Sequence, residues 1–257
     1  METKEQILWQ IANTVMVNHQ FVNPTGLYAG RCGLALFLFK AAHALQVDAY
    51  ENFASQIWQE CISSLAWQQD IDFKHGMTGI GWATLFILKQ GWAEGEPDEV
   101  LGNLDLKIER TLDRPFEFGD FVHGDFILPH FYLLERHKGD TLYWYTHESI
   151  ICHLKEAVNK RRKNGGEFSE TCRESIDRFF LSTTGEPIFT TKYPGTLYCN
   201  TPTNLSTQAW KTLLYGQNII WQFTEKELAD YIDRRIADFD ATEDLNLQGI
   251  LGIGLII

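Results

Sequence analysis

Two short segments of the chain repeat residue types that can exchange protons or bind a metal ion. The segments Asp72-Phe73-Lys74-His75-Gly76 and Asp120-Phe121-Val122-His123-Gly124 share four of five residues and lie 48 residues apart. An imidazole beside a carboxylate can act as an acid/base pair, or can offer nitrogen and oxygen ligands to a metal. We therefore take four residues as the candidate catalytic set and expect them around one depression: Asp72, His75, Asp120 and His123.

A purely structural interpretation of these turns also remains open. In that interpretation each aspartate accepts backbone N–H groups of its own turn, and each histidine bonds a neighbouring carbonyl, as short polar side chains often do. Two further carboxylates, Glu117 and Asp125, lie near the second turn and are candidates for substrate binding. The turns thus predict a site, but they leave its chemistry undecided.

Composition excludes some classes of function. The chain has 257 residues with 22 basic and 34 acidic side chains, a formal net charge of −12, which argues against nucleic acid as a partner. The one basic run, residues 160–163, is followed by Gly165-Gly166, and we expect it in a solvated loop. No apolar stretch reaches the roughly 18 residues of a membrane span, and the first residues do not resemble a signal peptide. Five scattered cysteines fit a reducing compartment, so we expect no membrane partner and a cytoplasmic location.

Glycine-led apolar segments recur along the chain. Gly30-Arg-Cys-Gly33, Gly76-Met-Thr-Gly79 and Gly249-Ile-Leu-Gly252 each begin an apolar run, and the first two are 46 residues apart. A period of this length suits a repeated helical hairpin. Helices that are apolar on all sides need neighbours on all sides, whereas amphipathic stretches such as residues 50–69 need only one. The pattern predicts a single all-α domain over residues 1–257, built as an α/α toroid with apolar helices inside and amphipathic helices outside.

Local signals place several elements within this plan. Inner helices should start near Gly30, Gly76, Gly124 and Gly249, and Pro129 should delay or kink the third of them. The apolar end of the chain should form a short inner helix that packs on residues 34–39. Thr224 and Glu227 have the spacing of a capping box. A short strand or irregular excursion is expected near residues 186–198.

The glycine-led repeats, the His-Gly turns and the period near 46 resemble the lanthionine synthetase C-like family. The resemblance extends from Gly26 to Ile257, with a poor match over residues 154–192. It implies a toroid of two concentric helical rings and, in fully equipped members, zinc-assisted addition of a cysteine thiol to a dehydrated Ser or Thr of a peptide. It also gives His75 the position of a catalytic histidine.

The zinc ligands of that family are incomplete in this chain. The resemblance implies a Trp-Cys-x-Gly turn and a Cys-His-Gly turn, but the chain has Tyr198-Cys199-Asn200-Thr201 and Leu247-Gln248-Gly249 at these places. Cys199 is then the one remaining candidate ligand, and a single thiolate cannot hold catalytic zinc. We therefore predict a degenerate member, in which zinc is not expected as a cofactor.

The resulting hypothesis is a toroid of the peptide-modification family that acts as a pseudoenzyme and binds a peptide or protein partner, with self-association possible. The alternative is an α/α-barrel carbohydrate-active enzyme, because sugar hydrolases use paired carboxylates. Eight Trp residues and 13% aromatic content would suit sugar stacking, and they equally suit a packed helical core.

Overall fold

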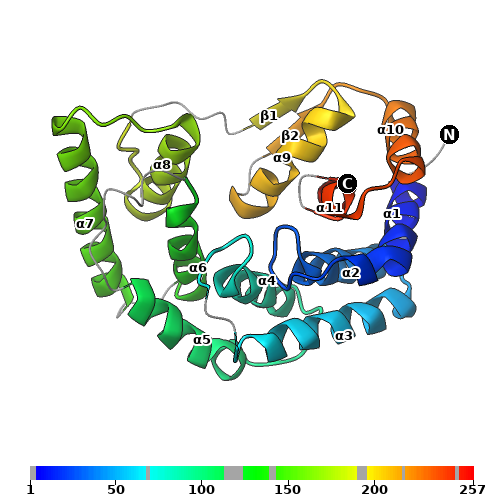
Figure 1. Ribbon diagram of the computed structural model, residues 1–257, viewed down its shortest axis with the longest axis horizontal. Helices are drawn as coiled ribbons and strands as arrows, with labels where there is room; N and C mark the ends of the chain where they lie inside the picture. Colours follow the sequence, from blue (N-terminus) through cyan, green and yellow to red (C-terminus); the bar gives the residue numbers. More distant parts are fainter. Residues whose placement is uncertain are drawn as a thin grey trace.

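The computed structural model describes residues 4–67, 70–112, 124–138, 143–189, 196–215, 218–246 and 249–257, and this part of the chain is mostly helical. An outer layer of helices curves around an inner layer, as expected for an α/α toroid (Figure 1). The outer helices are α1 (Lys4–Asn18), α3 (Asp48–Ser64), α5 (Pro97–Leu112), α7 (Tyr143–Lys163) and α10 (Glu225–Ala237). The inner helices are α2 (Arg31–Leu45), α4 (Met77–Lys89), α6 (Leu128–Arg136), α8 (Glu170–Thr184), α9 (Pro202–Tyr215) and α12 (Ile250–Ile256).

The two layers differ in burial as their sequences predict. Ten of the thirteen residues of α4 are buried, compared with four of the sixteen residues of α5. In α12 the buried residues run without interruption from Ile250 to Leu255. Apolar side chains from both layers join one hydrophobic core. Burial on all sides is therefore what separates the inner helices from the amphipathic outer ones.

The glycine-led turns start three inner helices at the predicted residues. The helices α2, α4 and α12 begin one residue after Gly30, Gly76 and Gly249. In each turn a Cβ on that glycine would lie 2.8 Å or less from the carbonyl oxygen six residues earlier, that of Pro24, Asp70 or Glu243. Only glycine lets the loop fold back so closely onto the helix start. The repeating unit thus includes the turn before each inner helix as well as the helix itself.

Neighbouring inner helices run in the same direction, so their starts share one rim of the ring. Helix α12 packs on α2, α2 on α4, and α4 on α6. The starts of α2 and α4 are joined by a hydrogen bond from Tyr28 N to Lys74 O of 2.8 Å. At the other ends of α4 and α6, Lys89 Nζ lies 2.8 Å from Glu135 Oε1. The predicted packing of the last helix on residues 34–39 is confirmed, since the Gly254 backbone lies against the Phe37 ring.

The third inner helix starts late, as Pro129 predicts. A 3₁₀ segment, η3 (Gly124–Ile127), precedes α6, and Pro129 is the second residue of the helix. Proline is tolerated there because N–H groups of the first turn have no partner within the helix. The predicted capping box is also present at α10, where Glu227 N donates to Thr224 Oγ1 at 3.2 Å and Thr224 N donates to Glu227 Oε2 at 2.7 Å.

One expectation needs correction. The basic run 160–163 is the last turn of α7 and not a loop. Cations are favourable at a helix C-terminus, and Arg161 also donates from Nη2 to Glu167 O at 2.8 Å. The expected strand or irregular excursion near residues 186–198 overlaps the strand β1 (Thr196–Cys199), while residues 190–195 lie outside the described part of the chain. The parallel partner of β1, β2 (Asn218–Trp221), was not predicted.

The remaining short elements are η1 (His19–Phe21) and α11 (Ala241–Asp244). In the part of the chain described above, none of the helices combines the length and the apolar character needed to span a membrane.

Candidate functional site

The first two turns of the rim fit closely together. We call residues 24–30 and 70–76, which lead into α2 and α4, the paired turns; they lie side by side near the middle of Figure 1. A Cβ on Gly26 would lie 2.5 Å from the Cα of His75, so this glycine allows the two backbones to touch. Together with the hydrogen bond from Tyr28 N to Lys74 O, this contact fixes the backbone that carries His75.

Asp72 serves its own turn, as the structural interpretation expects. Its Oδ2 accepts hydrogen bonds from Lys74 N at 3.0 Å and from His75 N at 2.8 Å. At the start of the same turn, Asp70 Oδ1 accepts a hydrogen bond from Asp72 N at 2.8 Å. A carboxylate that accepts two backbone N–H groups holds the loop in place. Asp72 is therefore a positioning residue for His75.

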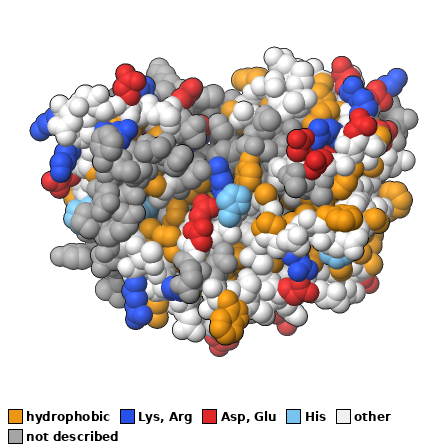
Figure 2. Space-filling model, viewed as in Figure 1, with side chains coloured by type: hydrophobic (Ala, Val, Ile, Leu, Met, Phe, Trp, Pro, Cys, Tyr) orange, Lys and Arg blue, Asp and Glu red, His pale blue; other side chains and the backbone are white. Residues whose placement is uncertain are grey.

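The side chain of His75 is exposed and lies beside an aromatic ring. Its imidazole meets the Tyr28 ring edge-on, with centroids 6.4 Å apart. Lys74 Nζ lies 5.3 Å from the centroid of the same ring. Figure 2 shows a histidine with acidic and basic side chains beside it at the middle of this face. An exposed imidazole that contacts the same ring as an ammonium group can donate hydrogen bonds to an oxygen-rich ligand or transfer a proton.

Sequence reasoning missed Tyr28 and Lys74, although a signal for both was present. Tyr28 stands two residues before Gly30, and Lys74 stands two residues before Gly76. The repeat register therefore places them at equivalent positions of neighbouring turns, where their side chains meet.

The other predicted site residues do not have a described geometry. Glu117, Asp120 and His123 lie outside the described residues. Asp125 is part of η3, but its side chain is outside the described part as well. Asp72 and His75 are thus together in one turn, and their pairing with the second turn stays a prediction.

The residues where the family implies zinc do not fit that ion. Cys199 is buried with 1% of its surface exposed, and burial raises the pKa of its thiol. A single thiol supplies one of the three protein ligands that a catalytic zinc ion needs. Leu247 and Gln248 lie outside the described residues, and neither side chain offers a thiolate or an imidazole. Within the described ranges there is also no group of three or more His, Cys, Asp and Glu that could hold a metal.

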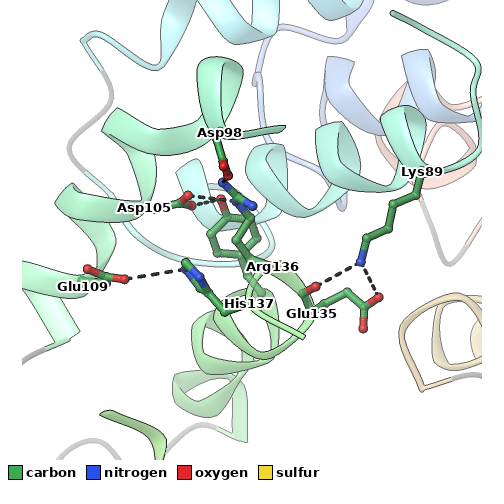
Figure 3. A network of polar contacts seen from close by, with 8 residues as sticks. Lys89, Asp98, Asp105, Glu109, Glu135, Arg136 and His137 are labelled. Atoms are coloured by element: carbon green, nitrogen blue, oxygen red, sulfur yellow. Dashed lines mark hydrogen bonds and ion pairs between the residues drawn. The ribbon is translucent and has the colours of Figure 1, made fainter. Parts of the chain in front are cut away.

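A second polar cluster has a structural role. Between α5 and α6, the buried carboxylate of Asp105 accepts hydrogen bonds from Tyr132 Oη and from Arg136 Nε, the latter at 2.9 Å (Figure 3). Arg136 also pairs with Asp98, and His137 Nε2 lies 3.7 Å from Glu109 Oε1. These contacts fasten an outer helix to its inner neighbour. The two residues that bond Asp105 lie 27 and 31 positions away from it in the chain, so no local pattern could reveal these contacts.

Comparison with known proteins agrees with the architecture. The family model described as lanthionine synthetase C-like protein matches residues 22–175, which is more than half of the chain and includes the paired turns. No curated protein and no solved structure gives a significant match. With its double layer of helices, its glycine-led inner starts and this match, the chain belongs to the lanthionine synthetase C-like family.

Proposed function

We propose that this protein binds a peptide at the paired turns and has no zinc-dependent cyclase activity. The observation that carries the proposal is the exposed imidazole of His75, held between a rigid turn and the Tyr28 ring at the rim of the toroid. Peptides offer carbonyl oxygens that an imidazole N–H and an ammonium group can bind. An aromatic ring beside them can cover an apolar side chain.

The turn that carries His75 is held in place before any ligand binds, and this supports a role in binding. The His75 backbone is held by the Asp72 carboxylate and by close packing against Gly26. Because the turn is already ordered, a ligand would not have to supply the free energy of ordering it. We include Asp120 and His123 in the proposed site by repeat register, because both precede η3 and α6 in the sequence and α6 packs on α4.

The absence of cyclase activity rests on ligand chemistry. Catalytic zinc needs three protein ligands and one open position. The chain offers Cys199 as one possible ligand, with Leu247 and Gln248 in place of Cys and His. Peptide binding without thioether formation is the function that this set of residues supports best.

Zinc content tests the second half of the proposal. Purified protein should hold far less than one zinc per chain after dialysis, because the donor set is incomplete. Elemental analysis by mass spectrometry measures this directly. A stoichiometric zinc content that disappears in Cys199→Ala would contradict the proposal. In the same preparation, a peptide with one dehydroalanine and one cysteine should keep its thiol reactive toward iodoacetamide.

Peptide binding tests the first half. Loss of the imidazole in His75→Ala should weaken binding of that peptide, labelled with fluorescein, about tenfold, or about 1.4 kcal/mol, as measured by fluorescence polarisation. His153→Ala is the matched control, because His153 is also exposed but lies on the outer helix α7. Equal affinities of wild type and His75→Ala would remove the paired turns from the binding site.

A further inference from the structure

The strand β1 has an outer edge at which its backbone groups point away from β2. The register pairs Tyr198 with Ile220 and Cys199 with Trp221, and Gln222 N donates to Cys199 O at 3.0 Å. In a parallel ladder every second residue of a strand bonds its partner. Leu197 and Cys199 are therefore the residues of β1 that bond β2. The N–H and C=O groups of Thr196 and Tyr198 face the other side.

That edge and the sheet face beside it are accessible. Among the described residues, none forms a backbone hydrogen bond with Tyr198 at the outer edge. Tyr198 is 64% exposed as a residue, and its cross-strand partner Ile220 is 48% exposed on the same face. The opposite face, which includes Cys199 and Ile219, packs toward α9 and the core. Figure 1 shows the pair beside α9.

An exposed face and only two strands are both unusual for a parallel sheet. Parallel strands normally have both faces covered, and a two-stranded sheet is marginal by itself. An open edge with an aromatic side chain beside it is the arrangement to which peptides add as a further strand. Backbone groups supply the hydrogen bonds there, and alternate side chains supply selectivity.

We propose that β1 binds an extended peptide as a third strand, with an apolar side chain of the peptide placed against Tyr198. The inference rests on the proposed function, since it names where a second part of the same peptide would lie. A four-residue strand is only about 13 Å long at 3.3 Å per residue. Its edge matches a short peptide and not the roughly 800 Å² per partner of a standard protein interface, which argues against a second copy of this chain.

Hydrogen exchange gives the most direct test. Peptides selected from a random library displayed on phage, with the full chain as bait, are added to the protein, and amide exchange is followed residue by residue. We expect the Tyr198 amide to exchange fast in the free protein and much more slowly with peptide. The Leu197 amide, already in the ladder, should change little. Selected peptides that leave the Tyr198 amide unprotected, or a failure to select any peptide, would overturn the proposal.

Substitutions at Tyr198 test the strand edge and the ring together. Tyr198→Pro removes the outward N–H and the ring while keeping the bonds between β1 and β2, and it should weaken binding of the selected peptides at least tenfold. Tyr198→Phe keeps both the N–H and the ring and should bind like wild type. Unchanged binding to Tyr198→Pro would also overturn the proposal, provided that circular dichroism shows the variant to be folded.

The two proposals fail in different ways. Binding that depends on His75 but not on Tyr198 would keep the paired turns and refute the third strand. Binding that depends on Tyr198 but not on His75 would support the third strand and refute binding at the paired turns. If light scattering shows that Tyr198→Pro abolishes a dimer of the free protein, the edge pairs two copies and the peptide proposal is wrong.

Discussion

Deletion of residues 249–257 is expected to leave the protein insoluble or unfolded. Ile250, Leu251 and Ile253 are completely buried in α12, which packs between α2 and α9. With Leu255, which is 8% exposed, these side chains contribute on the order of 6–12 kcal/mol by burial. That is comparable with the total stability of a typical domain, about 5–15 kcal/mol. Soluble yield and thermal melting followed by circular dichroism measure the effect.

If the truncated chain cannot be purified, point variants in α12 test the same prediction. Ile253→Ala should lower the free energy of unfolding by about 2–5 kcal/mol, the usual cost of truncating a fully buried aliphatic side chain. Ile257→Ala is the matched control, because Ile257 follows the helix and is only partly buried. The deletion would also remove Leu255 O, which accepts a hydrogen bond from Lys40 Nζ at 2.6 Å. A truncated protein that melts at the wild-type temperature would show that α12 does not support the ring.

Asp105→Ala should destabilise the protein by about 3–5 kcal/mol, because it removes the buried carboxylate that pairs with the Arg136 guanidinium. The side chains of Asp105 and Arg136 are 7% and 10% exposed, and their contact at 2.9 Å joins α5 to α6. Tyr132 Oη, which is buried, would lose its acceptor at the same time. Urea denaturation followed by circular dichroism gives the change in the free energy of unfolding.

The matched control for this variant acts on the same arginine. Asp98 also pairs with Arg136, but its side chain is 90% exposed. The hydrogen bond from Arg136 and the charge of Arg136 lower the pKa of Asp98, yet water screens an exposed pair strongly. Asp98→Ala should therefore leave the urea midpoint nearly unchanged. Equal losses in the two variants would show that burial does not set the strength of these contacts.

Elements whose causes are local could be predicted from the sequence. Gly30, Gly76 and Gly249 mark the starts of three inner helices because each turn folds back on the carbonyl oxygen six residues earlier. Pro129 set the late start of α6, and Thr224 with Glu227 set the start of α10. Such signals depend on neighbours in the chain, so they can be read without tertiary structure. The apolar runs after these glycines also predicted that the inner helices are buried on all sides.

Tertiary structure alone decided how distant residues meet. The pairing of β1 with β2 joins segments more than twenty residues apart, and nothing in either four-residue segment specifies its partner. The basic run at residues 160–163 stayed helical because Arg161 reaches the Glu167 carbonyl and because cations suit a helix C-terminus. Tyr28, Lys74 and His75 form one cluster because parallel inner helices bring their turns to the same rim. Local patterns thus located the turns, and the packing of neighbouring helices decided which side chains share a site.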